Sequence, residues 1–328
     1  MRKKKWWLII PLVLVIVYLL GPSPSKPEYA TAMPAIPAAP ASLETYVKEH
    51  EAQHKVKPGN EARIIWFNDS LKNKTEYAMV YLHGFSASQA EGDPVHKNIA
   101  KKFGCNLYLS RLAEHGIDTT ERLINLTAEE YWESAKEAYA IGKQLGNKVI
   151  LIATSTGGTL ALKLAAEYPE IYALVLLSPN IAINDPNAWI LNNHWGLQIA
   201  RMVVGSDYID SKDTRDIYKQ NWSFHYRLEG VVNLQELIET SMNESTFKKV
   251  TQPTLLLYYY KDAIHQDSVV KVSAMQEMFK QLGTPADKKR EIAMPNTGDH
   301  VIGSYIKSKD VAGVEREIER FIREVLGL

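Results

Sequence analysis

A serine follows directly after an apolar run that has the character of a buried strand. The run is Val149–Ala153, and Ser155 lies two residues beyond it, ahead of two consecutive glycines and a helix-forming segment. Small residues around a serine permit the strained turn of a Gly-x-Ser-x-Gly motif, which projects the hydroxyl above a sheet. Ala153 replaces the first glycine of that motif, whereas Gly157 provides the second. The pattern favours Ser155 as a nucleophile over an ordinary strand-to-helix turn.

A second glycine-containing loop follows another apolar run, Ala78–Leu82. It reads His83-Gly84-Phe85, and glycine lets a chain turn close to a neighbouring site. Backbone amides at such turns stabilise the oxyanion of acyl transfer, so we expect the amides of Phe85 and Thr156 to form an oxyanion hole. We expect His83 to support this loop through a hydrogen bond and not to act as a base.

The elements that position these loops alternate between apolar runs and helical patterns, which is typical of an α/β fold. Several runs are apolar at almost every position, as in parallel strands that are covered on both faces. A capping box at Thr127–Glu130 predicts a helix that runs to Leu145, with Gly146 as its left-handed stop. A stripe from Val311 to Val325 predicts a last helix that packs on the sheet. The predicted strands are Arg63–Phe67, Ala78–Leu82, Asn106–Leu109, Val149–Ala153, Ala173–Leu177, Thr254–Tyr260 and Glu291–Met294.

These motifs give the chain, from about Glu76 to its end, a resemblance to α/β-hydrolases of the monoacylglycerol lipase, carboxylesterase and serine aminopeptidase (S33-like) group. The resemblance lies in His83-Gly84-Phe85, in Leu112–Gly116, where relatives carry a Gly-His-Gly turn, and in the turn around Ser155. It implies a mostly parallel sheet flanked by helices, with a helical cap. It specifies the substrate poorly, because this fold hosts many chemistries.

The resemblance also implies a catalytic acid and a histidine, which follow the serine in chain order. Asp262 occupies the place of the family's acid after the strand Thr254–Tyr260, and His300 follows the last predicted strand. We therefore expect Asp262 and His300 to complete a triad. Asp267 is the competing acid, but we interpret it as the cap of a helix over 268–278.

The insertion at about 180–250 carries many large apolar residues for a segment without clear strands. We expect part of it to pack on the core and the rest to form a lid over an acyl pocket, with Trp189 and Trp195 binding the substrate. A serine aminopeptidase-like activity would need an acidic pocket for a free amine, which Glu229, Glu236 and Glu239 of the cap could provide, although solvated helix faces account for them more simply.

The expected function is hydrolysis of acyl-lipid or other small apolar esters, without a metal or an organic cofactor. The alternatives are a serine aminopeptidase-like enzyme, a thioesterase, and a membrane-tethered binding protein on an inactive hydrolase scaffold.

The composition excludes two further classes of protein. Lys+Arg and Asp+Glu both number 38, so the chain lacks the basic character of a nucleic-acid binder. The single cysteine, Cys105, excludes an internal disulfide framework.

The first 20 residues have the plan of a signal anchor: four basic residues from Arg2 to Lys5 precede the apolar stretch Trp6–Leu20. We expect a membrane-anchored protein with its hydrolase domain outside the cytoplasm, and a cleaved signal peptide with export is the alternative. A Pro/Ala-rich linker over 21–41 is expected to be a semi-rigid spacer. The hydrolase domain then occupies 42–328.

Overall fold

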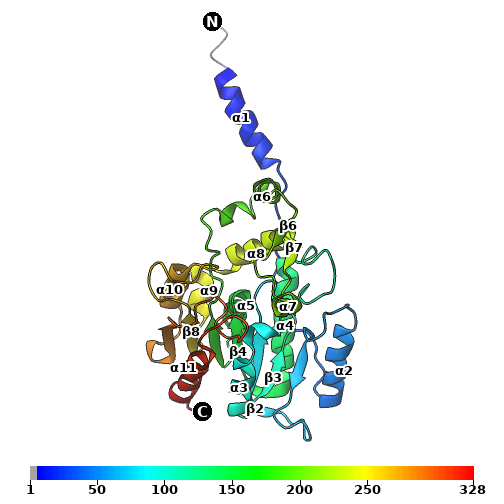
Figure 1. Ribbon diagram of the computed structural model, residues 1–328, viewed down its shortest axis with the longest axis vertical. Helices are drawn as coiled ribbons and strands as arrows, with labels where there is room; N and C mark the ends of the chain where they lie inside the picture. The colour runs from blue at the N-terminus through cyan, green and yellow to red at the C-terminus, as the bar shows by residue number, and fades with distance from the viewer. Residues whose placement is uncertain (1–5) are drawn as a thin grey trace.

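The computed structural model describes residues 6–328, with side chains from Ile9 onwards. Its centre is a seven-stranded sheet of order β1-β3-β2-β4-β5-β8-β9, in which β1 alone is antiparallel to its neighbour (Figure 1). The seven predicted strands are confirmed, and only their ends differ. They are β1 (Arg63–Ile65), β2 (Thr75–Leu82), β3 (Asn106–Leu109), β4 (Gly146–Thr154), β5 (Ala173–Leu177), β8 (Thr254–Tyr258) and β9 (Lys289–Ala293).

Helices cover both faces of this sheet, which is why the inner strands are apolar at consecutive positions. Alternate residues of β2 enter different cores: Val80 packs on the face covered by α4 and α5, and Met79 on the face covered by α3 and α11. Cys105 is buried in the second core. The helices are α2 (Pro40–Glu51), α3 (Val95–Lys102), α4 (Ala128–Leu145), α5 (Thr156–Glu167), α10 (Val272–Gln281) and α11 (Val311–Glu324).

The capping box at the start of α4 is confirmed, because the Thr127 hydroxyl accepts from the Glu130 amide and the Glu130 carboxylate accepts from the Thr127 amide. The predicted left-handed stop at Gly146 is wrong. Gly146 has φ −147° and ψ 158° and already belongs to β4. Glycine is needed there for a close approach: a Cβ would lie 2.3 Å from the Ala78 amide nitrogen in β2.

The chain between β5 and β8 leaves the sheet and forms the cap. Its elements lie above the carboxyl ends of the strands (Figure 1). They are η2 (Ala188–Ile190), α6 (Gly196–Val204), β6 (Tyr208–Asp210), α7 (Asp216–Asn221), β7 (His225–Arg227) and α8 (Leu228–Ser241). A further helix, α9 (Glu244–Lys249), returns the chain to the sheet.

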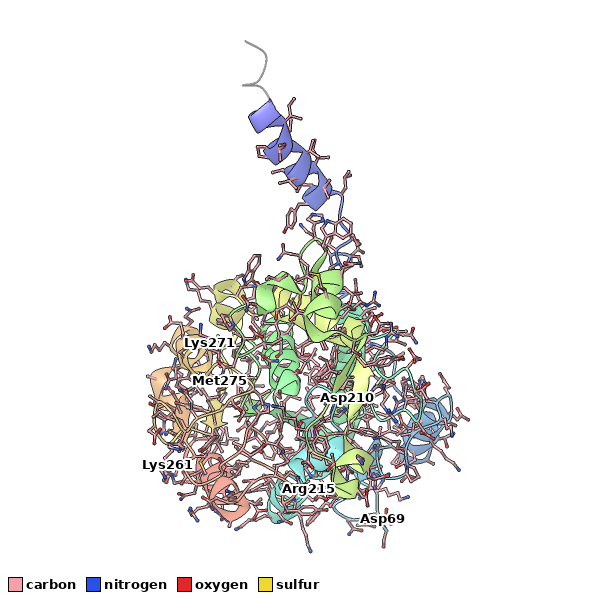
Figure 2. All side chains as sticks on the ribbon, turned by 45° about the horizontal axis from the view of Figure 1, so that its top comes forward. Asp69, Asp210, Arg215, Lys261, Lys271 and Met275 are labelled. Atoms are coloured by element: carbon pink, nitrogen blue, oxygen red, sulfur yellow. The ribbon has the colours of Figure 1, made fainter. Side chains whose placement is uncertain are left out.

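The amino-terminal apolar segment forms α1 (Trp6–Leu19), which projects from the cap end of the molecule (Figures 1 and 2) and contacts the cap at its end, where the Tyr18 ring packs edge-on against His194. None of the helices within residues 6–328 is long and apolar enough to cross a membrane. The four basic residues of the expected anchor lie outside the described part of the chain. Residues 21–38 form no helix or strand and lead from α1 to α2.

Candidate active site

Ser155 forms the apex of the turn between β4 and α5, with φ 52° and ψ −119°. A non-glycine residue at positive φ is strained, so surrounding contacts must hold it in place. The Ser155 amide donates to the Leu177 carbonyl at 3.0 Å, and its carbonyl accepts from the Asn180 amide at 2.9 Å. The side chain of Ser155 therefore opens into the space above the carboxyl ends of the strands.

The two residues beside this turn explain why the motif works with alanine at its first small position. Ala153 pairs with Leu82 of β2 and is not among the residues with positive φ, so a methyl group fits there. Gly157 is different, because a Cβ would lie 2.1 Å from the Leu82 carbonyl oxygen. The close approach of α5 to β2 thus requires Gly157 but not a glycine at 153.

The acid beside His300 is Asp267 and not the predicted Asp262. Asp267 Oδ2 lies 2.6 Å from His300 Nδ1, and both side chains are almost wholly buried. Asp262 is half exposed and binds its own loop: its Oδ1 accepts from the Ile264 amide and lies 3.0 Å from His265 Nδ1. The structure brings Ser155 and His300 to one cavity and leaves Asp262 outside it.

The loop after β8 explains the error. Tyr260 and Gln266 form an antiparallel bridge, so the chain folds back on itself before it reaches the sheet end again. The Asp267 amide then donates to the Tyr259 carbonyl, which places Asp267 where a residue directly after the strand would otherwise lie. Asp267 also caps a turn, as its Oδ1 accepts from the Val270 amide, but α10 begins only at Val272.

The electrostatics of this pair suit a base that must carry a proton. Burial by itself lowers the pKa of His300, but the charge and hydrogen bond of Asp267, together with the charges of Glu91 and Asp299, outweigh burial, and the pKa of His300 is raised. Burial acts in the opposite sense on Asp267, where the His300 partner and the amides of Val269 and Val270 keep the pKa low. His300 Nε2 is buried without a hydrogen-bond partner among residues 6–328, and it belongs to the cavity that Ser155 lines.

The three amides of the predicted oxyanion loop differ in their hydrogen-bond partners. The Gly84 amide donates to Glu91 Oε2 at 2.5 Å, and the Ser86 amide donates to His115 Nε2 at 2.9 Å. The Phe85 amide between them has no such partner within the described chain. This arrangement fixes the loop on both sides of Phe85 and leaves the Phe85 amide unpaired, as an oxyanion donor must be.

The histidine of this loop is buried and acts as a support. His83 Nε2 accepts from the Leu112 amide at 3.0 Å, and burial lowers the pKa of His83 to about 4. His115, in the stretch that carries the family resemblance, is also buried with a strongly lowered pKa, and its ring contacts the Tyr131 hydroxyl. Both rings are therefore neutral and hold backbone amides.

A cavity of about 680 Å³ lies over Ser155 and His300. The cap lines it with residues that the sequence reasoning missed, while Trp189 and Trp195 are not among them. Trp189 is 55% exposed at a second cavity, and Trp195 Nε1 donates to the Val17 carbonyl at the end of α1. The structure therefore does not place either tryptophan over Ser155, where the sequence led us to expect them. The cap residues lining the cavity are Tyr218, Trp222, Tyr226, Val231 and Leu234.

The acidic residues proposed for an amine pocket also lie elsewhere. Glu229 forms ion pairs with Arg201 and Arg227, Glu236 accepts from Asn192, and none of the three predicted glutamates lines the cavity over Ser155. A different carboxylate does so. Glu91 is buried beside Gly84, and burial raises its pKa to about 7 although the Gly84 amide and His300 oppose that shift.

Comparison with known proteins supports the fold and the family. The family described as "Serine aminopeptidase, S33" matches residues 76–294. No curated protein matches the chain. Similar solved structures include one of the LipS and LipT pair of metagenome-derived lipolytic enzymes, with a TM-score of 0.66 at 17% identity over 82% of this chain and 99% of that one.

Two further structures cover this chain to a similar extent. The monoacylglycerol lipase of Paleococcus ferrophilus has a TM-score of 0.57 at 15% identity over 80% of this chain and 98% of its own. Est1E from Butyrivibrio proteoclasticus, with ferulic acid bound, has a TM-score of 0.55 at 18% identity over 84% and 99%. At these identities the structures show a shared fold alone. Together with the family match over two thirds of the sequence, they show that this chain is a hydrolase of the serine aminopeptidase S33 family, within the α/β-hydrolase superfamily.

Proposed function

We propose that this protein is a serine hydrolase that cleaves carboxylic esters with apolar acyl groups. The observation that carries the proposal is the cavity in which Ser155, at its strained turn, opens beside a buried His300 held by Asp267. A nucleophile, a base and an orienting acid in this relation form the arrangement of nucleophilic acyl transfer. The two backbone amides of Phe85 and Thr156 complement it as oxyanion donors.

The proposed reaction has two halves. Ser155 Oγ attacks the acyl carbonyl while His300 Nε2 takes its proton; the tetrahedral oxyanion accepts from the Phe85 and Thr156 amides. Collapse breaks the bond to the alcohol, which leaves with the proton from His300. Water then attacks the acyl-enzyme, giving its proton to His300, which returns a proton to Ser155 as the acid is released. Asp267 stabilises the imidazolium in both halves.

The walls of the cavity favour esters with apolar groups. The cap side is aromatic, with Tyr218, Trp222 and Tyr226 on α7, the following loop and β7, whereas polar residues that include Gln266, Asp299 and Lys307 line other parts. The cap is held close to the oxyanion loop, since the Ser223 amide donates to the Ser86 carbonyl at 2.6 Å. Apolar and aromatic walls with few polar groups are typical of small-molecule sites.

A labelling experiment tests this function. A fluorophosphonate probe should modify the wild-type chain and the Ser206→Ala control, whose serine is exposed in the cap. Ser155→Ala should lose both labelling and hydrolysis of p-nitrophenyl esters, since removing the nucleophile of a triad costs on the order of 10⁶-fold in turnover. A wild-type chain that neither reacts with the probe nor hydrolyses these esters would instead fit a binding protein on an inactive scaffold.

An aminopeptidase-like activity is the second candidate, and Glu91 is the observation that favours it. Its carboxyl group lines the cavity beside the nucleophile and offers a partner for a free amino group. Comparison of amino-acyl p-nitroanilides with simple acyl esters separates the two functions. Amide turnover that exceeds ester turnover, and that falls in Glu91→Gln, would favour the peptidase. Acyl thioesters in the same assay test the thioesterase alternative.

We also propose that the hydrolase domain lies outside the cytoplasm, on the basis of the charge pattern of the first 20 residues. Fusion of alkaline phosphatase after Leu328 should give an active phosphatase, because that enzyme folds only after export. An inactive fusion that accumulates to normal levels would contradict the proposal.

A further inference from the structure

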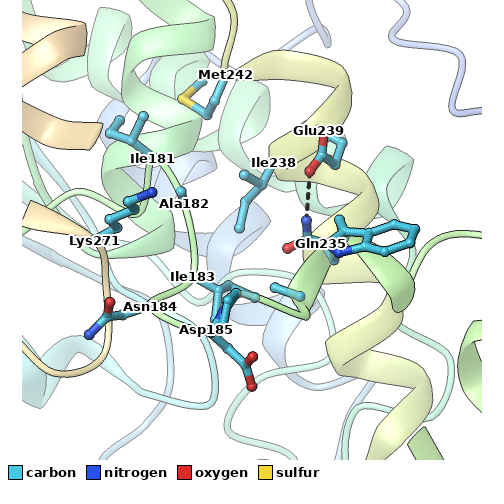
Figure 3. A pocket seen from close by; sticks show the side chains of 13 residues that line it. Ile181, Ala182, Ile183, Asn184, Asp185, Gln235, Ile238, Glu239, Met242 and Lys271 are labelled. Atoms are coloured by element: carbon cyan, nitrogen blue, oxygen red, sulfur yellow. Dashed lines mark hydrogen bonds between the residues drawn. The ribbon is translucent and has the colours of Figure 1, made fainter. Parts of the chain in front are cut away.

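A second cavity, of about 450 Å³, shares Ile183 with the one over Ser155, and Figure 3 shows the side chains that line it. It lies between α8 and the segment 181–185 that follows β5. Ile183 lines both cavities, and so does α8, which contributes Val231 and Leu234 to the first and Ile238 to the second; Met242, directly after α8, also lines the second. The three helical positions are three or four residues apart, so they form one face of α8. The two cavities therefore share Ile183 and this face of α8 as a common wall.

The second cavity changes character from its inner to its outer side. Ile181 and Ile238 are buried within it, whereas Asn184, Asp185 and Lys271 are exposed where it opens to solvent. Figure 3 shows the last three side chains along the lower and left margin of the pocket. The inner part therefore suits an apolar chain, and the outer part suits a polar end.

Gln235 supplies a polar group on the inner wall. Only 3% of the residue is exposed, and its Nε2 donates to Glu239 Oε1 at 2.8 Å. This bond orients the amide and leaves its Oε1 buried without a partner among residues 6–328. In Figure 3 the oxygen points away from Glu239, towards the side where Ile183 lies. A buried carbonyl without a donor is costly, so this oxygen is poised to accept from a ligand.

We propose that this second cavity is a distal subsite of the hydrolase, which takes the far end of an extended substrate and binds a hydroxyl or amide N–H on it through Gln235. The inference rests on the ester hydrolysis proposed above. The preferred substrates are then chains long enough to follow α8 from Val231 to Ile238, about 10 Å, and they carry a hydrogen-bond donor near the end. A plain hydrocarbon chain fills the same space but leaves the Gln235 oxygen unpaired.

The test compares esters with and without a terminal hydroxyl at equal length. One arm uses p-nitrophenyl esters with acyl chains of about four to ten carbons, which bracket the span along α8. The other arm uses butyrate monoesters of diols and of plain alcohols, and their hydrolysis is measured by the release of acid. Two arms are needed because either the acyl side or the alcohol side of the ester can enter the subsite. For long chains in one arm, the hydroxyl should raise kcat/KM by roughly three- to ten-fold, the value of one neutral hydrogen bond.

Two variants make the test specific. Gln235→Leu removes the acceptor at nearly constant volume, so the ratio of hydroxylated to plain long esters should fall to about one. Ile183→Phe narrows the junction and should lower kcat/KM for long esters more than for acetate esters. Met202→Ser, on the exposed face of α6, is the control and should retain the wild-type profile. Thermal unfolding of each variant shows whether it is folded. If Gln235→Leu does not fold, Ile183→Phe provides the test.

The outcomes separate the subsite from the reaction. If the preference for hydroxylated esters survives Gln235→Leu, the proposed subsite is wrong while ester hydrolysis stands. The same holds if the wild-type enzyme shows no such preference at any chain length in either arm. Long esters that are unaffected by Ile183→Phe overturn the passage between the cavities. A wild-type chain that hydrolyses no ester in either arm overturns the proposed function and the subsite with it.

Discussion

Asp267 Oδ2 and His300 Nδ1 lie 2.6 Å apart although 33 residues separate them in the chain. Two loops meet at this bond: the one that follows β8 and the one that follows β9. Both side chains are buried, with 0% of Asp267 and 7% of His300 exposed. A buried carboxylate in this position fixes the imidazole ring and leaves Nε2 as the nitrogen that faces the cavity with Ser155.

This bond favours Asp267 over Asp262 as the acid, whereas the sequence analysis favoured Asp262. Asp267→Asn should lower kcat for a p-nitrophenyl ester by roughly 10⁴-fold, because the amide favours the wrong tautomer of His300. Asp262→Asn is the matched control and should lower kcat far less, since Asp262 is half exposed and does not contact His300. Equal losses in the two variants, or the greater loss in Asp262→Asn, would show that the buried pair is structural.

The sequence predicted the sheet well because its strands are covered on both faces. Such strands are apolar at almost every position, and this local signal needs no knowledge of their neighbours. The same local reasoning could not identify Asp267 as the acid. Counting residues after β8 assumes a direct path from the strand, but Tyr260–Gln266 is a local fold-back that moves the sheet-end position to Asp267.

The cap shows a second limit of sequence reasoning. A high density of apolar residues predicts that some are buried, but not which partner buries them. Met202 and Val203 are 76% and 78% exposed on α6, and Trp195 contacts the amino-terminal segment. The cavity over Ser155 is instead lined by Tyr218, Trp222 and Tyr226, whose spacing of four residues was the only available signal.

The turn around Ser155 gives a prediction about its two small positions. Gly157→Ala should abolish most activity and destabilise the fold by about 1–3 kcal/mol, because the new methyl group meets the Leu82 carbonyl and pushes on the oxyanion loop. Ala153→Gly should keep its activity and cost at most about 1 kcal/mol in chain entropy. Denaturant unfolding and ester turnover of both variants check this, and a Gly157→Ala enzyme with wild-type kcat would refute the close contact.

Glu91 gives a prediction about stability and pH. Its pKa is about 7 in the fold and 4.5 in an ordinary environment, chiefly because burial disfavours the charged form. Between these values the folded chain retains a proton that the unfolded chain loses. The contribution of Glu91 is therefore fully present below pH 4.5 and is lost as the pH rises towards 7. The slope is at most about 1.4 kcal/mol per pH unit.

Glu91→Gln removes this titration and keeps an oxygen for the Gly84 amide. The stability difference between Glu91→Gln and wild type should therefore increase in favour of the variant between pH 4.5 and 7 and level off above. Urea unfolding at a series of pH values measures it. The control is Glu76→Gln, whose carboxylate is exposed and paired with Lys148. A constant difference across the range would mean that Glu91 titrates normally.

The proline-rich segment before α2 lies on the hydrolase domain over much of its length. Trp132 Nε1 donates to the Ala30 carbonyl at 2.7 Å, and the Tyr168 hydroxyl donates to the Thr31 carbonyl at 2.8 Å. Lys163 Nζ lies 3.9 Å from the centre of the Tyr29 ring, within the range of a cation–π contact. Proline lowers the entropy that such a segment loses on docking, which favours this arrangement.

This docking predicts an interaction between chain length and one tryptophan. Trp132→Phe removes the hydrogen bond to Ala30, and this loss alone should destabilise the full chain by about 1 kcal/mol. In a chain that begins at Ala39 the partner is gone, so the same substitution should cost about 1 kcal/mol less and retain only the packing loss of the buried ring. Trp66→Phe is the matched control, because Trp66 Nε1 donates to Glu44 Oε1 at 2.8 Å, within the part that both chains keep. Its cost should therefore be equal in the two lengths. Denaturant unfolding of the six proteins gives the coupling energy directly. If Trp132→Phe costs the same in both lengths, the segment does not dock in solution.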